Sequence, residues 1–113
     1  TDPFVQIDSV ELQGDKYLVN FTVAGFTPTF DEGGYHTHLF LDDIAPENAG
    51  ANGNPPGDWV ITDATDSYLT KYGPADLSSR DAEQMCSLVA DSGHNIAFPG
   101  TTTGNCVDLP PSG

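Results

Sequence analysis

The chain has 113 residues, and this length fits a single domain covering residues 1–113. Its 17 acidic residues stand against only three basic ones, which gives a net charge of −14. Nucleic acid and anionic membranes are therefore poor partners, because almost no cations are present to neutralise phosphates. No apolar stretch approaches the length of a membrane span, so no membrane insertion is expected. The chain opens on Thr1-Asp2-Pro3 without a basic segment, so a secreted precursor would already have lost its signal peptide.

Alternation of apolar and polar residues near the start predicts a β-hairpin. In the first segment, Val5 and Ile7 face one side and Val10 faces the other. A turn-forming cluster follows at residues 13–16, and the alternation resumes over residues 17–24. Two such segments joined by a tight turn are typical of paired antiparallel strands.

Short apolar segments separated by turn formers continue through the rest of the chain. The expected strands are residues 35–42, 59–62, 67–72, 84–90, 96–98 and 106–109. Residues 43–57 are rich in Gly, Pro and Asn and predict a long surface loop, where binding functions often lie. Residues 78–91 fit either one capped helix or a short helical turn at 78–83 followed by a strand, and the surrounding strands favour the second. About seven short strands predict an all-β, immunoglobulin-like β-sandwich.

The chain has two cysteines, Cys86 and Cys106, and their spacing matches neither a redox motif nor a zinc knuckle. An even count in a short acidic chain predicts one disulfide and an oxidising compartment. The expected location is therefore secreted, periplasmic or at the cell surface. Two buried, reduced thiols are the alternative.

One segment carries residues suited to chemistry, the His36-Thr37-His38 sequence on the strand expected at residues 35–42. Residues two apart on a strand face the same side about 7 Å apart, so both imidazoles can approach one metal ion. Asp42 continues that face and is expected as a third ligand or as a partner that orients a histidine. His94 is the remaining histidine and a candidate ligand if the fold brings it close.

The alternative for this histidine pair is a structural role, since two ligands fall short of a complete metal site. If a metal binds, copper or zinc is expected. Calcium is less favoured, because the acid-rich loop after the strand lacks the EF-hand spacing. No G-x-S-x-G motif is present and no carboxylate pair stands out among the many acids. The sequence therefore favours a protein that is not an enzyme.

The segment G-Y-H-T-H-L-F-L-D at residues 34–42 resembles the copper-binding strand of copper/zinc superoxide dismutases. The resemblance covers nine residues and implies metal ligation by His36 and His38. That family needs further histidines after the strand, and this chain has none between Leu39 and Gly93. Dismutase activity is therefore not expected.

A broader resemblance starts at Gly34 and covers most of the remaining chain. The segments H-T-H-L-F-L-D-D-I-A-P-E-N-A-G, Q-M-C-S-L-V-A-D-S-G-H and G-N-C-V-D-L-P are similar to an uncharacterised family of secreted bacterial β-sandwich domains. This resemblance implies an exported or surface protein and brings no activity with it.

Two functions follow as hypotheses. The first is a non-enzymatic extracellular or cell-surface domain that acts as a binding module or as a structural or filament subunit. Its partners would be other surface proteins or further copies of itself, joined through an exposed strand edge. The second is a secreted or periplasmic protein that binds copper or zinc through the His-x-His strand. The position of His94 relative to His36 and His38 discriminates between them.

Overall fold

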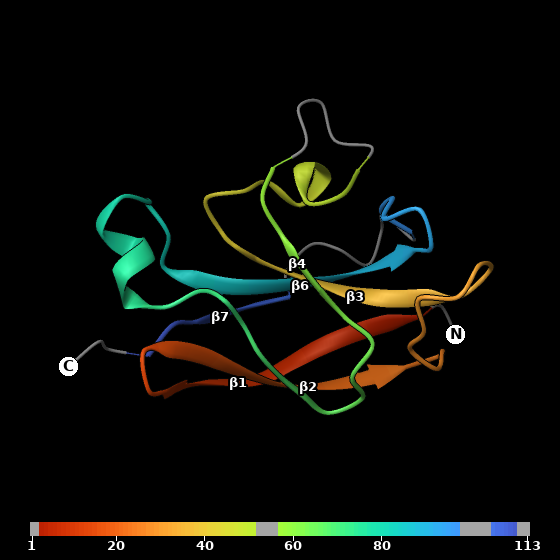
Figure 1. The fold of residues 1–113 in the computed structure, drawn as a ribbon, viewed down its shortest axis with the longest axis horizontal. Coiled ribbons are helices and arrows are strands. Elements are labelled where there is room, and N and C mark those ends of the chain that lie inside the picture. The colour runs from red at the N-terminus through yellow and green to blue at the C-terminus, as the bar shows by residue number, and fades with distance from the viewer. Residues whose placement is uncertain (1–2, 52–56, 98–104, 111–113) are drawn as a thin grey trace.

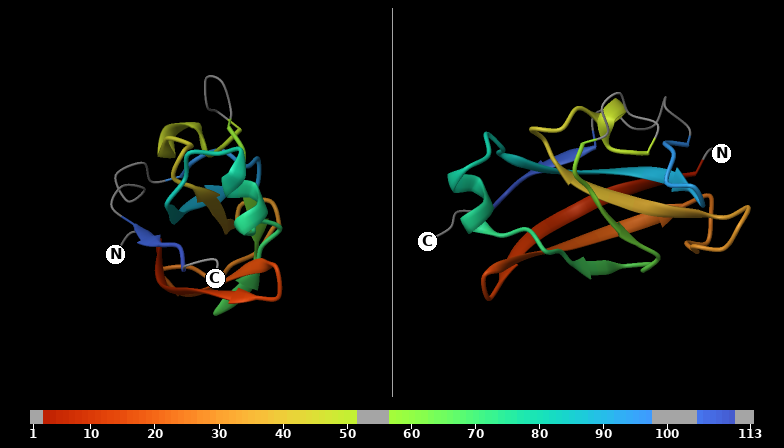
Figure 2. Two further views of the ribbon diagram at one scale, coloured as in Figure 1. Left: turned by 90° about the vertical axis from the view of Figure 1, so that its left-hand side faces the viewer. Right: turned by 45° about the horizontal axis from the view of Figure 1, so that its top comes forward.

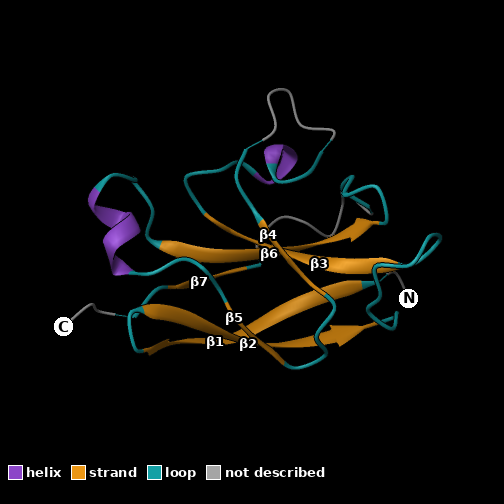
Figure 3. Cartoon of the chain, viewed as in Figure 1, coloured by secondary structure: helices purple, strands orange, loops and turns teal. Residues whose placement is uncertain are grey.

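The computed structural model describes residues 3–51, 57–97 and 105–110, and it contains two antiparallel sheets packed face to face (Figure 1). The described strands are β1 (Phe4–Gln13), β2 (Lys16–Ala24), β3 (Tyr35–Leu41), β4 (Val60–Thr62), β5 (Ser67–Leu69), β6 (Gln84–Asp91) and β7 (Cys106–Asp108). Two 3-10 turns, η1 (Pro46–Asn48) and η2 (Pro74–Ser78), interrupt the long connections (Figure 3). The predicted all-β sandwich is confirmed.

One sheet has the strand order β1-β2-β5 and the other has the order β4-β3-β6-β7. The chain therefore crosses between sheets after β2, after β4 and again after β5, as the two further views in Figure 2 show. In the constant-type immunoglobulin order the fourth strand belongs to the sheet of the first two. Here β4 instead pairs with β3, in the position that C′ takes in variable-type domains.

The predicted hairpin forms, and its register contains an irregularity that the alternation did not show. Gly14 adopts a φ of 68° in the two-residue turn between Gln13 and Lys16, a conformation that glycine adopts without strain. A β-bulge lies between Ile7 and Ser9. It returns Val10 to the core side, where that residue packs with the inner cluster. The expectation that Val10 faces away from Ile7 was wrong for this reason.

Several expected element boundaries shift. The helical turn predicted at residues 78–83 lies earlier, at Pro74–Ser78, because Pro74 suits the first helical position and the Asp76 carboxylate accepts a hydrogen bond from Gly73 N–H at 2.8 Å. Of the strand expected at residues 96–98, Ile96 forms one isolated bridge with Ala90, and Phe98 lies outside the described residues.

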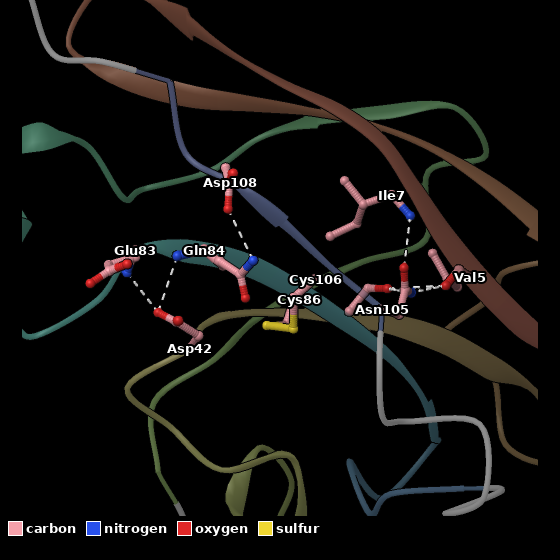
Figure 4. The surroundings of a disulfide bond; sticks show 10 residues. Val5, Ile7, Asp42, Glu83, Gln84, Cys86, Asn105, Cys106 and Asp108 are labelled. Atoms are coloured by element: carbon pink, nitrogen blue, oxygen red, sulfur yellow. Dashed lines mark hydrogen bonds between the residues drawn. A yellow bond between two sulfur atoms is a disulfide. The ribbon is translucent and has the colours of Figure 1, made fainter.

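The predicted disulfide is confirmed. Cys86 on β6 and Cys106 on β7 lie directly opposite one another in the register and are bonded (Figure 4). The bond closes a loop between positions 20 apart in sequence, which on the chain-entropy estimate stabilises the fold by about 3 kcal/mol. It fixes the three-residue β7 to the edge of the longer β6.

The side chain of Asn105, next to this disulfide, joins the two sheets. Ile7 N–H donates to Asn105 Oδ1 at 3.1 Å, and Asn105 Nδ2 donates to the Val5 carbonyl and to Ser87 Oγ (Figure 4). The amide therefore presents one acceptor and one donor to the edge of β1, as a neighbouring strand would. It satisfies backbone groups of β1 that no strand of its own sheet reaches.

We expect Asn105→Ala to lower the free energy of unfolding by about 1–3 kcal/mol, because Ile7 N–H loses its partner and the Val5 carbonyl keeps only its hydrogen bond from Ser87 Oγ. Urea unfolding measures the effect. Gln84→Ala is the matched control, since it removes a nearby exposed hydrogen bond to Asp108. The control should stay within about 0.5 kcal/mol of the wild type. Equal effects in the two variants would show that the amide does not join the sheets.

Candidate metal centre

Strand β3 is buried on both faces, and its alternation separates two kinds of side chain. Leu39 and Leu41 face the other sheet and belong to the inner core. His36, His38 and Phe40 face the opposite side of their own sheet, and all three are fully buried. The two predicted ligands therefore share one face, as the period of two requires.

The outer face of β3 is buried because the connection from β3 to β4 folds over it. In Figure 2 the segment that contains η1 lies over the outer side of β3 and β6. Ala49 from this segment packs with Phe40 in a second, smaller apolar cluster, which Ile44 and Trp59 border. Within the loop expected at residues 43–57, the described residues Ile44 and Ala49 thus help to shield the histidine face from water.

The turn after β6 brings His94 to the two strand histidines. One ring nitrogen from each of His36, His38 and His94 lies within 4.8 Å of the others. His94 Nδ1 lies 3.2 Å from His36 Nε2. The ring centroids of His36 and His38 are 5.0 Å apart. The three predicted histidines therefore form one cluster.

The orientation of His38 leaves one particular nitrogen for a metal ion. Its Nδ1 lies 2.7 Å from the Ala49 carbonyl, so Nδ1 carries the proton and donates it. Its Nε2 is buried and has no hydrogen-bond partner among the described residues. A metal ligand with one nitrogen fixed by a backbone carbonyl and the other left free is the usual arrangement of a coordinating histidine.

Aromatic rings pack around the cluster and restrict the imidazoles. The Trp59 ring stacks on His38 with a centroid distance of 5.3 Å and an interplanar angle of 12°. Phe30, from the loop before β3, meets His36 edge-on at 5.0 Å. Contacts on both strand histidines limit their rotation, which preorganises the nitrogens for a ligand.

The backbone at His94 is held in an uncommon conformation. Its φ is 65°, the only positive φ at a residue other than glycine in the described part of the chain. The Asp91 carboxylate holds the turn by accepting hydrogen bonds from Gly93 N–H and Asn95 N–H, both at 3.0 Å. A left-handed residue without a glycine's freedom costs about 1 kcal/mol, and such residues cluster at functional sites. Here the conformation brings the imidazole against His36.

Burial keeps the strand histidines uncharged. Desolvation and the nearby His94 together lower the pKa of His36 to about 4, against the opposing effects of Asp91 and Asp63. Desolvation also lowers the pKa of His38 to about 4, against the opposing effect of its hydrogen bond to Ala49. Both imidazoles are therefore neutral near pH 7, the form that coordinates a metal.

The expectation that Asp42 joins the histidines, as ligand or as orienting partner, was wrong. Strand β3 ends at Leu41, and the Asp42 carboxylate accepts hydrogen bonds from Glu83 N–H at 2.7 Å and Gln84 N–H at 3.1 Å (Figure 4). Four residues along a strand also separate Asp42 from His38 by about 13 Å. Its role is to bond the backbone that leads into β6.

Arg80 fixes the connection from β3 to β4 near both of its ends. Arg80 donates to Asp43 through Nε at 2.8 Å and Nη2 at 2.7 Å, and through Nη1 to Asp58 at 3.0 Å. Tyr72 also donates its hydroxyl to Asp58, at 3.0 Å. Asp43 begins the connection and Asp58 precedes Trp59, so these bonds position the ring that stacks on His38.

Three nitrogens in this arrangement come close to a coordination sphere. Two nitrogens bound tetrahedrally to zinc lie about 3.3 Å apart, because each Zn–N distance is about 2.0–2.1 Å. The pair His36 Nε2 and His94 Nδ1 already has nearly this separation, at 3.2 Å. The ligand nitrogen of His38 lies within 4.8 Å of the other two.

Sequence reasoning did not identify Phe30, Ala49 or Trp59 as part of the site. Their contacts depend on how loops fold over the sheet, which local alternation does not encode. Trp59 is the only tryptophan and follows directly on the long loop, and these two features were the available signal.

Comparisons with protein-family models, with characterised proteins and with solved structures gave no match. Among the described residues, no helix has the length and apolar character needed to span a membrane.

The lowered pKa values predict a loss of stability in acid. The unfolded chain binds protons at His36 and His38 near pH 6.5, while the folded chain binds them only near pH 4. Stability from these groups is therefore complete above pH 6.5 and falls by roughly 3 kcal/mol for each histidine as the pH drops from 6.5 to below 4. Urea unfolding of metal-free protein between pH 7 and 4 measures this. A variant carrying His36→Gln and His38→Gln should lack most of the fall; an unchanged fall would assign it to other groups.

The Arg80 contacts predict that Arg80→Gln destabilises the protein by roughly 1–3 kcal/mol, since charged hydrogen bonds to two carboxylates are lost. Lys71→Gln is the control, because the ion pair of Lys71 with Asp58 involves a side chain that is 62% exposed. Its effect should be below about 0.5 kcal/mol. The fluorescence of the single tryptophan should change in Arg80→Gln and stay constant in the control. Unchanged fluorescence in both variants would contradict the positioning of Trp59 by Arg80.

Proposed function

We propose that this protein binds copper or zinc outside the reducing cytoplasm through His36, His38 and His94. The observation that carries the proposal is the convergence of these three imidazoles, with ligand nitrogens within 4.8 Å of one another. They come from β3 and from a turn 56 residues later in the chain, so their meeting is a property of the fold and not of a local motif.

The buried nitrogens support metal binding over a purely structural role. A structural histidine in a core normally satisfies its polar atoms, because an unpartnered buried group costs about 1–3 kcal/mol. His38 Nε2 and His36 Nδ1 both lack a hydrogen-bond partner among the described residues. A metal ion at His38 Nε2 removes one of these costs. The geometry therefore favours a metal site over the binding-module and filament hypotheses.

The donor set favours late first-row metals. Neutral imidazoles suit copper and zinc, whereas calcium and magnesium require oxygen ligands. No carboxylate joins the cluster within the described residues. The disulfide between Cys86 and Cys106 supports a secreted, periplasmic or surface location, because such bonds persist in oxidising compartments.

We expect copper(II) and zinc to bind with one ion per chain. His36→Ala, His38→Ala and His94→Ala should each weaken binding by at least about 100-fold, because two remaining nitrogens hold a metal poorly. Thr37→Val is the control, since Thr37 is equally buried but faces the other sheet. Isothermal titration calorimetry at neutral pH measures all five proteins.

Two outcomes would contradict the proposal. One is wild-type binding weaker than about 1 mM for both ions, or about −4 kcal/mol. The other is equal affinity in the histidine variants and in Thr37→Val. A metal-dependent rise in the melting temperature of the wild type, absent in the histidine variants, provides a second measurement.

A further inference from the structure

An open pocket of about 480 Å³ borders the histidine cluster at His94. Its lining residues are Trp59, Val60, Ile61, Tyr68 and His94. His94 is one of the proposed metal ligands, and Trp59 stacks on another, His38. The pocket therefore reaches the metal centre from the side of β4.

The coordination sphere is incomplete on the protein side. Structural zinc sites are closed by four protein ligands, whereas sites that exchange a ligand have three and leave one position open. Among the residues that the structure describes, the cluster contains three histidines and no fourth histidine, cysteine or carboxylate. Asp42, the fourth candidate from the sequence, bonds the backbone of Glu83 and Gln84 instead.

The walls of the pocket indicate what can occupy that position. They consist of two aromatic rings, two aliphatic side chains and one imidazole, with no charged residue. Flat aromatic walls favour a flat ligand. An anion would gain little here, because the chain carries a net charge of −14 and two of its three cations already pair with Asp58.

We propose that the bound metal keeps one exchangeable position facing this pocket, and that the position takes a neutral nitrogen heterocycle of the imidazole class. This proposal rests on the proposed metal site. The heterocycle coordinates through its ring nitrogen, while its faces pack between Trp59 and Tyr68. A free imidazole compound and a histidine side chain of another chain share this chemistry.

The test uses the full chain loaded with one equivalent of copper(II). Imidazole is titrated while electron paramagnetic resonance and visible absorption are recorded. A fourth nitrogen ligand should shift both spectra with saturation in the millimolar range, and azide should bind at least about tenfold more weakly, since it is an anion. A second arm replaces imidazole by an end-blocked Gly-His-Gly peptide. Binding of imidazole alone identifies a small-molecule site, and binding of both identifies a site open to a histidine side chain.

Two variants test the pocket. Ile61→Trp fills it, so imidazole affinity should fall at least about tenfold while copper affinity is unchanged. Tyr68→Leu removes one aromatic wall of the pocket and should weaken the binding of imidazole by about threefold. Leu69→Trp is the control, since Leu69 is exposed on β5 and does not line the pocket.

The outcomes separate this proposal from the metal site itself. Failure of copper to bind overturns both. If copper binds but imidazole does not change its spectra, the metal site is supported and the exchangeable position is contradicted. The same conclusion follows if imidazole only removes copper from the protein. Equal imidazole affinity in the wild type, Ile61→Trp and Tyr68→Leu overturns the assignment to this pocket.

Discussion

The site depends on the burial of β3 on both of its faces. An antiparallel sheet commonly packs one face on a core and leaves the other in water. If β3 did so, His36 and His38 would be hydrated, and protons would compete for their nitrogens near pH 6.5. The cover provided by the connection to β4 removes that water and keeps the imidazoles neutral. The same burial leaves Nε2 of His38 without a hydrogen-bond partner among the described residues. Burial therefore explains both why this imidazole is uncharged and why its Nε2 is free to coordinate.

The third histidine arrives through strand pairing. The antiparallel register of β3 and β6 places Asp91 opposite Tyr35, so the end of β6 lies beside the start of β3. A tight turn immediately after β6 must then fall over the first residues of β3, and His94 occupies that turn. Its left-handed backbone, held by the Asp91 carboxylate, directs the ring toward His36 rather than into solvent. The strained backbone of His94 thus accompanies the approach of its imidazole to His36.

The sequence predicts features that depend on neighbouring residues, and it does not predict contacts between residues that are distant along the chain. The hairpin, the sandwich and the shared face of His36 and His38 follow from a period of two, which is a local property. The disulfide followed from a count of two cysteines. Asp42 was misplaced because alternation does not reveal where a strand ends, and β3 stops one residue before it. His94 was named as a candidate, but its approach depends on the pairing of β3 with β6. The stacking of Trp59 depends on a loop held by Arg80, and no local pattern encodes either contact.

The acidic character of the chain and the neutral character of the cluster have complementary effects. A divalent cation entering a buried site loses its hydration, and three uncharged imidazoles do not offset that cost by charge attraction alone. Acidic residues outside the cluster contribute a negative potential without becoming ligands, and Asp63 and Asp91 are near enough to His36 to affect its pKa. That potential attracts any cation and weakens with added salt over about 10 Å. Discrimination then comes from the nitrogen donors, which disfavour calcium and magnesium. In the proposed metal site, the acidic surface would therefore attract cations, while the three imidazoles would select a late transition metal over calcium.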